Sequence, residues 1–393
     1  MYRRHVAANL CGTTVTIRWV TEKLKVATGL EAELISWKAK KIGIGQGFLS
    51  HIIKVEFTWD DEDCELPESV VVKVPTIEAL PEMIEQTADL KKIGEPQEQA
   101  MILVRVHDNE CTAYHWLSSR QHPSRIPFPK IYHLQAITAD QSGVIIMEDL
   151  SNSGFTVNMG DGFGLGQLLS LADGLASLHA SSILSNNWQD RFHPSPRMKY
   201  DQLPDIYEKI SEKLKEEHPA YFENIDQLES FFDSDKIYST AHLSHEQIGL
   251  PPVIVHGDLW CSNLMFDSLE PDRLLALIDW QAVHKGNLCE DLARVLVSGV
   301  DAELRREETE NVLKVYHDRL AEKVGDAAEI SLDQVKQAFY CVLPMAMCFF
   351  VAAVPYILNS PIVEVENKEE AVEKILTRAK CIIEDVLAMN IEL

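Results

Sequence analysis

The residues best suited to chemistry lie in a short polar loop between two apolar runs. The loop carries His256, Asp258 and Asn263, and the runs on either side cover 253–255 and 264–266. A carboxylate such as Asp258 can accept the proton of an attacking hydroxyl group. The amide oxygen of Asn263 can bind a magnesium ion without adding negative charge beside that carboxylate. The pattern therefore predicts a base and a metal ligand within one loop.

A second carboxylate follows another apolar run. Residues 274–278 end at Asp279, which lies 21 residues after Asp258, far enough for a hairpin to return the chain to the same site. Kinase catalytic loops have this spacing: an Asp acts as base, and an Asn five residues later and a further Asp hold magnesium on the nucleotide phosphates. We therefore expect Asp258 to be the base and Asn263 and Asp279 to be the metal ligands.

Each of these residues has an ordinary structural explanation when it is taken alone. An Asp after an apolar run is usually a turn or helix-capping residue. A single histidine such as His256 is more often packed in a loop than catalytic, and we expect it to support the loop. The prediction depends on the set of two aspartates and one asparagine, each beside an apolar run.

Two upstream features fit the same chemistry. Gly43, Gly45 and Gly47 alternate between two strand-like segments, where a loop can fold over phosphate groups and offer its backbone amides. An ordinary hairpin turn would have the same composition. Lys73 interrupts the valine run 70–74, where a kinase places the lysine that contacts the α- and β-phosphates. A solvent-facing lysine on an edge strand is the alternative.

An acidic partner for Lys73 is predicted in the helix expected between 97 and 119. Glu110 shares one stripe of that helix with apolar residues such as Val106 and Ala113. An unpaired carboxylate in an apolar face is costly, and pairing with Lys73 removes that cost. A glutamate at the rim of the stripe is the alternative.

The elements around these residues change in type at about residue 150. Before it we expect a three-stranded antiparallel meander, a helix and a further strand, over 35–41, 48–59, 70–74, 97–119 and 143–147. After it the pattern is mainly helical. We predict an α+β fold with a nucleotide-binding N-lobe over 1–150. The C-lobe, over 151–393, would carry the catalytic loop and the acceptor site.

The connection between the two lobes falls at residues 147–150. Backbone groups hold an adenine at such a connection, so Glu148 and Leu150 are assigned to nucleotide binding by position alone. Farther on, Asn287 and Glu290 resemble a helix-capping pair. We expect Asp291, the next residue, to brace the catalytic loop.

Composition narrows the class of protein. The chain has 393 residues with 36 basic and 61 acidic side chains, a net charge of −25, which argues against a broad nucleic-acid surface. Its apolar share of 46% is ordinary for a globular protein. The eight cysteines include no C-x-x-C pair, so we expect reduced thiols, no zinc site and a cytoplasmic location. Nothing in the sequence indicates an oligomeric state.

Two segments have some features of membrane or targeting sequences. Residues 338–358 carry no charge over 21 residues, which is long enough to cross a bilayer. Pro344 and Pro355 interrupt this segment and no basic cluster flanks it, so we expect a core helix. The N-terminal apolar run is short and is broken by Arg18, so we expect no targeting peptide.

Three motifs together resemble one known family. The motifs are HGDLWCSNLMF, IDWQ and EDLAR, at 256–266, 278–281 and 290–294. They resemble the choline kinase-like (CHK) and ecdysteroid kinase-like proteins of the aminoglycoside phosphotransferase superfamily, in a nematode branch without an assigned substrate. The resemblance covers nearly the whole chain.

The resemblance implies a protein kinase-like bilobal fold with a small, mainly antiparallel-sheet N-lobe and a large helical C-lobe. It implies ATP with Mg²⁺ and transfer of the γ-phosphate to a hydroxyl group of a small molecule. Asp258 would be the base, and Asn263 and Asp279 the metal ligands. The apolar segment 338–358 would be a buried helix of the larger lobe.

The motifs do not identify the acceptor, so a steroid, a choline-type amine and an aminoglycoside stay open. Six aromatic residues and a surplus of acidic residues precede the catalytic loop, and they suit either a cation-binding pocket or a solvated acidic surface over a core. The aromatic residues are Trp188, Phe192, Tyr200, Tyr207, Tyr221 and Phe222. The alternative function is a catalytically silent pseudokinase that binds a ligand or a protein. A protein kinase is disfavoured because Trp280 and Gln281 follow Asp279 where such an enzyme has Phe-Gly.

Overall fold

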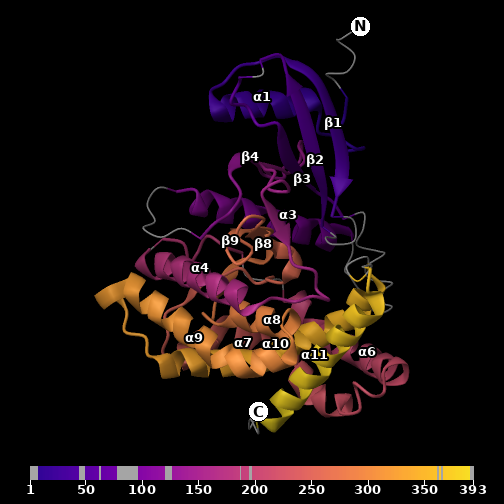
Figure 1. The fold of residues 1–393 in the computed structure, drawn as a ribbon, viewed down its shortest axis with the longest axis vertical. Helices are drawn as coiled ribbons and strands as arrows, with labels where there is room; N and C mark the ends of the chain where they lie inside the picture. The colour runs from indigo at the N-terminus through magenta and orange to yellow at the C-terminus, as the bar shows by residue number, and fades with distance from the viewer. Residues whose placement is uncertain are drawn as a thin grey trace.

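The structure, a computed structural model, describes residues 8–43, 49–61, 63–77, 96–119, 126–185, 187–193, 197–360, 363 and 366–389. Figure 1 shows a small part built around a twisted sheet and a larger helical part below it. The α+β bilobal fold predicted from the sequence is confirmed. The assignment of 1–150 and 151–393 to two domains stays a prediction.

A five-stranded antiparallel sheet forms the smaller lobe. Its strands are β1 (Leu34–Ile42), β2 (Ser50–Trp59), β3 (Ser69–Pro75), β4 (Ile131–Gln135) and β5 (Val144–Glu148), in the order β1-β2-β3-β5-β4. The expected meander and the later strand are present, whereas β4 was not predicted. Because β3 pairs with both β2 and β5, it is an inner strand of the sheet.

The two faces of this sheet belong to different cores. Val70 and Val72 of β3 and Ile146 of β5 are buried in a core that includes one face of helix α1 (Ile17–Thr28). Ile145 of β5 belongs to the other, larger core. Side chains alternate along a strand, so Lys73 lies on the face opposite to Val72 and is directed toward the larger lobe.

Helix α1 was not predicted from the sequence. It begins after Thr16, whose side chain accepts a hydrogen bond from the amide of Trp19, and it ends at Gly29 in the left-handed conformation. Its buried residues include Ile17, Val20 and Leu24, which follow helical spacing. It packs near β4, where the rings of Trp19 and His133 meet edge to face at 5.1 Å.

Helix α3 (Pro96–Leu117) connects the two parts of the molecule. Its last turns bury Ala113, Tyr114, Trp116 and Leu117 in the larger core, although the helix precedes residue 150 in the chain. The helix therefore packs with the larger lobe while it lies beside the face of the sheet that carries Lys73.

The larger lobe is mainly helical. Its helices are α4 (Leu165–Leu184), α5 (Met198–Asp201), α6 (Leu203–Glu217), α7 (Ser234–Gln247), α8 (Glu290–Ser298), α9 (Ala302–Val324), α10 (Leu332–Asn359) and α11 (Lys368–Ala388). Short 3-10 helices are η2 (Ile225–Phe232), η3 (Cys261–Asn263), η4 (Trp280–Ala282) and η5 (Gly325–Ala327). Two small antiparallel sheets, with the orders β6-β8-β9 and β10-β7, deliver the loops of the site. Their strands are β6 (Gly154–Thr156), β7 (Val253–Val255), β8 (Leu264–Asp267), β9 (Leu274–Leu277) and β10 (His284–Gly286).

Helix α10 contains the uncharged segment considered above as a membrane span. It has the length and composition to cross a bilayer, and 61% of its most apolar 18-residue window is buried inside the protein. It packs against α6, α7, α8, α9 and α11. Ser331 and Gln334 form a capping box at its start. These contacts are those of a core helix.

One arginine ties three parts of the larger lobe together. Arg378 of α11 is only 1% exposed and donates to Asp301, at the start of α9, at 2.7 and 2.9 Å. It also donates to the main-chain oxygens of Met159, Gly160 and Ser298. Its guanidinium group therefore has acceptors on several sides, as a buried charge requires.

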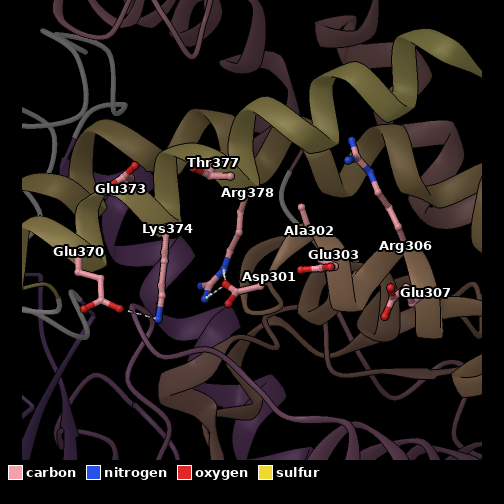
Figure 2. A pocket seen from close by; sticks show the side chains of 10 residues that line it. All are labelled: Asp301, Ala302, Glu303, Arg306, Glu307, Glu370, Glu373, Lys374, Thr377 and Arg378. Atoms are coloured by element: carbon pink, nitrogen blue, oxygen red, sulfur yellow. Dashed lines mark hydrogen bonds and ion pairs between the residues drawn. The ribbon is translucent and has the colours of Figure 1, made fainter.

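An open groove of about 760 Å³ lies between α9 and α11, and Arg378 is one of the side chains that line it (Figure 2). The cations of the groove are paired: Lys374 lies 3.2 Å from Glu370, and Arg306 lies 2.8 Å from Asp385. Arg378 has Asp301 as its partner. The groove is therefore a charged seam between two helices, with its positive charges already neutralised.

We expect Arg378→Met to lower the free energy of unfolding by about 3–5 kcal/mol, because it leaves Asp301 and several carbonyl groups without their donor. Arg319→Met is the control, since Arg319 is half exposed and its pairs with Glu322 and Asp173 should contribute about 0–1 kcal/mol. Urea denaturation of both variants measures the difference. Equal losses in the two variants would contradict the role given to Arg378.

Candidate active site

The loop that carries Asp258 runs between β7 and β8. Gly257 has a φ of 78°, in the left-handed region, and a Cβ atom there would lie 2.4 Å from the main-chain oxygen of Ala282. Only glycine suits this position, because other residues disfavour the conformation and would clash. The close approach brings the loop against the segment that follows Asp279.

A buried carboxylate holds the main chain of this loop. Asp291 of α8 accepts hydrogen bonds from the amides of His256 and Gly257, at 2.7 and 2.9 Å. Burial raises the pKa of the Asp291 carboxyl above its ordinary value, and the nearby His256 and the two amides offset part of that shift. Asp291 thus braces the loop from below.

His256 links the loop to the strand end before Asp279. Its Nε2 lies 3.0 Å from the carbonyl oxygen of Ile278, and its Nδ1 lies 3.3 Å from the amide nitrogen of Asp258. A carbonyl can only accept and an amide can only donate, so the ring carries its proton on Nε2. This histidine is buried and has a supporting position.

Asn263 makes the second link. Its side-chain nitrogen donates to the main-chain oxygen of Asp258 at 2.8 Å, and its own main-chain oxygen accepts from the amide of Ile278 at 3.1 Å. The side-chain amide is fixed through its nitrogen, which leaves its oxygen as the group able to bind a metal. Short contacts therefore hold Asp258, Asn263 and the residue before Asp279 together.

Asp279 follows β9 and has a φ of 66°, a left-handed conformation that is uncommon outside glycine. Its Oδ1 lies 2.7 Å from Nζ of Lys73, which comes from the smaller lobe. Unusual backbone conformations of this kind concentrate at functional sites. The contact joins the sheet of the smaller lobe to the loop region of the larger one.

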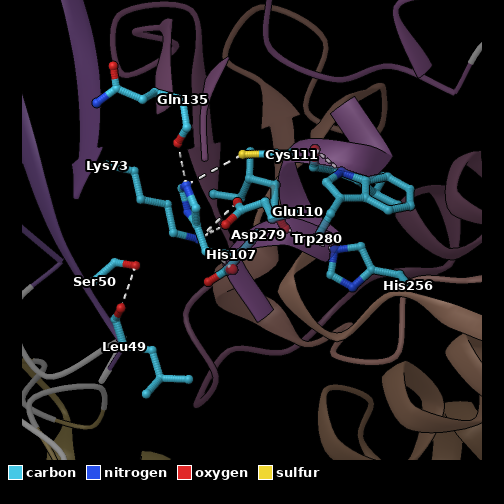
Figure 3. A network of polar contacts seen from close by, with 12 residues as sticks. Leu49, Ser50, Lys73, His107, Glu110, Cys111, Gln135, His256, Asp279 and Trp280 are labelled. Carbon is cyan, nitrogen blue, oxygen red and sulfur yellow. Dashed lines mark hydrogen bonds and ion pairs between the residues drawn. The ribbon is translucent and has the colours of Figure 1, made fainter. Parts of the chain in front are cut away.

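Lys73 also pairs with Glu110 of α3, the partner that the sequence analysis assigned to it. Nζ lies 2.9 and 2.7 Å from the two carboxylate oxygens of Glu110. Figure 3 shows Lys73, Glu110 and Asp279 converging between the sheet and the loops of the larger lobe. Lys73 is 4% exposed and Glu110 is 1% exposed, so neither an edge lysine nor a rim glutamate describes them.

Burial and charge act in opposite directions on this pair. Burial alone would lower the pKa of the Lys73 ammonium, but the carboxylates of Asp279 and Glu110 outweigh it, and the net shift is upward. Burial raises the pKa of the Glu110 carboxyl, and the Lys73 ammonium counteracts that rise. The ammonium therefore stays charged at neutral pH and offers a fixed positive charge at the site.

The remaining residues predicted for nucleotide binding are Gly43, Gly45, Gly47, Glu148 and Leu150. Gly43 directly follows β1 and has a φ of 63°, and Gly45 and Gly47 lie outside the described residues. Glu148 accepts a hydrogen bond from the amide of Lys130 at 3.0 Å. The carbonyl of Leu150 accepts from two amides in the turn that follows it. The nucleotide-binding roles of these residues stay predictions.

Asp149, which ties the sheet to the connection between the lobes, was not predicted from the sequence. Its carboxylate lies 2.8 Å from Nζ of Lys54 and accepts from the hydroxyl of Ser69 and the amide of Ser151. Burial would raise the pKa of this carboxyl, but the hydrogen bonds, led by that of Lys54, lower it to about 2. The sequence feature that could have indicated Asp149 is its position close after an apolar strand.

Arg294 of α8 was also missed. Its Nη2 lies 3.2 Å from Oδ1 of Asp258. The available signal was helical spacing, because Arg294 follows Asp291 by three residues and therefore shares a face of the helix with it.

The aromatic residues before the catalytic loop are mainly core side chains. Trp188, Phe192, Tyr200, Tyr207 and Phe222 are buried in the larger core, and Tyr221 packs partly buried against it. Of the two interpretations left open by the sequence, the structure supports a core under an acidic surface.

The donor set suits a magnesium ion bound partly by a phosphate ligand. Within the described ranges, no group of three or more His, Cys, Asp or Glu side chains is arranged to hold a metal. Asn263 and Asp279 offer two hard oxygen ligands, and Mg²⁺ is commonly bound by one or two protein oxygens together with substrate phosphates. The residues present therefore fit such an ion.

We expect Lys73→Met to lower the free energy of unfolding by about 3–5 kcal/mol, because Glu110 would stay buried without a cation. The double variant Lys73→Met with Glu110→Met replaces the pair by apolar side chains of similar size and should recover most of that loss. Urea denaturation of the single and double variants provides the measurement. Losses that simply add in the double variant would show that the two side chains are not energetically coupled.

Comparison with known proteins gives one family model that matches residues 5–392, described as "Uncharacterized oxidoreductase dhs-27". A Caenorhabditis elegans protein with that name is 26% identical over 340 residues, covering 83% of this chain and 40% of that protein. The C. elegans "Uncharacterized kinase-like protein D1044.1" is 29% identical over 257 residues, covering 63% of this chain and 64% of that protein. The chain thus spans less than two thirds of the length of either relative.

Solved structures with a similar fold are small-molecule kinases and phosphotransferases. A choline kinase from Cryptosporidium parvum has a TM-score of 0.49 at 14% identity, with 90% of each chain covered. A putative aminoglycoside phosphotransferase from Ralstonia eutropha has a TM-score of 0.47 at 15% identity, covering 94% of this chain and 98% of that one. The match over nearly its whole length places this chain in the DUF1679 family, and both relatives named above are nematode proteins, in agreement with the nematode branch predicted from the sequence.

Proposed function

We propose that the protein is a small-molecule kinase that transfers the γ-phosphate of ATP to a hydroxyl group of a small acceptor. The convergence of Lys73, Glu110 and Asp279 beside the loop that carries Asp258 and Asn263 is the observation that supports this proposal most directly. With the roles proposed here, these residues would supply a fixed cation, a base and two metal-binding oxygens in one region.

In this proposal Asp258 accepts the proton of the acceptor hydroxyl. The bond from the acceptor oxygen to the γ-phosphorus forms while the bond from that phosphorus to the bridging oxygen breaks, and ADP leaves. Lys73 would hold the α- and β-phosphates, and Asn263 and Asp279 would hold Mg²⁺. When bound, Mg²⁺ neutralises charge on the phosphate oxygens. Such transfers depend mainly on positioning and charge, which this region supplies.

The remaining predicted residues complete the proposed nucleotide site. Gly43, Gly45 and Gly47 would cover the phosphates with backbone amides. The backbone at Glu148 and Leu150 would hold the adenine. All eight cysteines are free thiols, which suits the proposed cytoplasmic location.

Oxidoreductase activity, which the name of one relative mentions, has weaker support here. The alignment covers 40% of that relative, so more than half of it has no counterpart in the match. A dinucleotide-binding fold is built on parallel strands, with a glycine-rich turn between a strand and a helix. The strand pairs of the described residues are antiparallel, and the strand β2 follows the glycine cluster.

We expect ATP with magnesium to raise the melting temperature, since a ligand at 100 times its Kd adds about 2.7 kcal/mol to the folded state. Asp279→Ala should reduce this shift because it removes one of the two proposed metal ligands. Thermal denaturation with and without the nucleotide gives the comparison, with the exposed Asp326→Ala as the control. A wild-type protein that shows no shift would argue against nucleotide binding altogether.

We expect Asp258→Asn to keep the thermal shift and to lower kcat by about 100-fold or more, because the amide cannot accept the proton. The assay is release of ADP from ATP in the presence of a small-molecule extract, followed by a search for phosphorylated products. Full turnover in Asp258→Asn would remove Asp258 as the base. A wild-type protein that binds ATP and releases no ADP would favour the pseudokinase alternative.

A further inference from the structure

Arg294 is the basic side chain that contacts the proposed base. It extends from α8, and its Nη2 lies 3.2 Å from Oδ1 of Asp258. The Arg294 side chain is 14% exposed and that of Asp258 is 33% exposed, so the contact lies at the boundary between the core and solvent. The roles proposed above do not include Arg294.

The guanidinium group of Arg294 lies over an aromatic ring. Its central carbon lies 4.9 Å from the centroid of the Phe349 ring, on α10. Phe349 is in turn packed edge to face against Tyr200 at 6.4 Å. A planar cation on a packed ring has little freedom to rotate. The nitrogen that faces Asp258 therefore has a defined direction.

The hydrogen bonds of Arg294 differ from those of a purely structural arginine. Arg378 donates to a carboxylate and to three carbonyl groups. Arg294 donates to Oδ1 of Asp258, while its Nε and Nη1 are buried without a hydrogen-bond partner among the described residues. Buried donors are normally satisfied, so an arginine kept for stability alone would have more acceptors. The hydrogen bonding of Arg294 is directed at one atom of the base.

We propose that Arg294 is a positioning residue that holds Oδ1 of Asp258 and leaves Oδ2 for the acceptor hydroxyl. The inference rests on the kinase activity proposed above. The main chain of Asp258 is already held on both sides, through its amide nitrogen by His256 and through its carbonyl oxygen by Asn263. Rotation of the side chain is the freedom that this leaves, and the contact with Arg294 restricts it.

The two carboxylate oxygens of Asp258 have different roles because only one of them is free to accept a proton. A guanidinium group has N–H donors and no acceptor, so Arg294 cannot take the acceptor proton and Oδ1 stays occupied by a donor. The proton of the hydroxyl therefore moves to Oδ2. Correct orientation of such a group at the moment of reaction has a large effect on rate.

Arg294→Met, which keeps the length of the side chain and removes its charge, tests the proposal. We expect kcat for ADP release to fall by about 10- to 100-fold, since misplacing a reacting group has effects of this size. The KM for ATP should stay within about twofold, and the thermal shift with ATP and magnesium should be unchanged, because the nucleotide does not bind through Arg294. Assays run with magnesium and ATP alone and with the small-molecule extract.

Two further variants make the result specific. Arg294→Lys keeps the charge but not the planar group that stacks on Phe349, so its kcat should lie between those of the wild type and Arg294→Met. Arg197→Met is the matched control, because Arg197 also stacks on an aromatic ring, Tyr238, at 4.7 Å, and pairs with Asp201 and Asp235. Its kcat should equal that of the wild type.

Wild-type kcat in Arg294→Met, or a thermal shift lost together with kcat, would overturn the proposal. If Arg294→Met does not fold, Arg294→Lys decides: a reduced kcat at unchanged KM supports the proposal and an unchanged kcat overturns it. A wild-type protein that releases no ADP would overturn the proposed kinase activity, and this inference would fall with it. Equal turnover in the wild type and in the Arg294 variants removes this inference alone.

Discussion

The buried ammonium group of Lys73 needs carboxylates around it, and this requirement fixes how three separate parts of the chain meet. Moving a charge from water into the protein interior costs more free energy than the whole folded state has to spare, unless opposite charges replace the water. Glu110 comes from α3, and Asp279 comes from the end of β9. Strand, helix and loop must therefore take up positions that bring both carboxylates within hydrogen-bonding distance of one nitrogen. The smaller lobe cannot shift on the larger one without breaking this arrangement.

The loop that carries Asp258 depends on a second set of polar contacts, all within the larger lobe. Asp291 accepts hydrogen bonds from two amides of the loop, and hydrogen bonds of His256 and Asn263 link the loop to Ile278. A buried polar network stabilises a single arrangement when each of its members has a partner. The position of the loop is thus set by α8 and by the strand β9, whereas the position of Lys73 is set by the sheet. Asp279 belongs to both sets, because it follows Ile278 directly and binds Lys73.

The sequence predicted those residues of the candidate site whose side-chain type and spacing already suggest a reaction. Asp258, Asn263 and Asp279 could be found because they are polar residues at the ends of apolar runs, and Glu110 because it interrupts an apolar stripe. Asp149 and Arg294 were missed because their partners are remote in the chain: Lys54 for Asp149, and Asp258 for Arg294. Helical spacing shows which residues share a face, but it does not show what that face meets.

The sequence also could not identify the surroundings of a whole helix, and α10 shows why. An uncharged run of 21 residues satisfies the length for a membrane span and for a helix surrounded by others equally well, since both environments exclude charge. Helices on several sides of α10 account for its composition. Phe349 of the same helix is half-buried, and Arg294 stacks on its ring. The apolar core therefore extends to the side chain that contacts Asp258, and packing far from the loop contributes to the orientation of the proposed base.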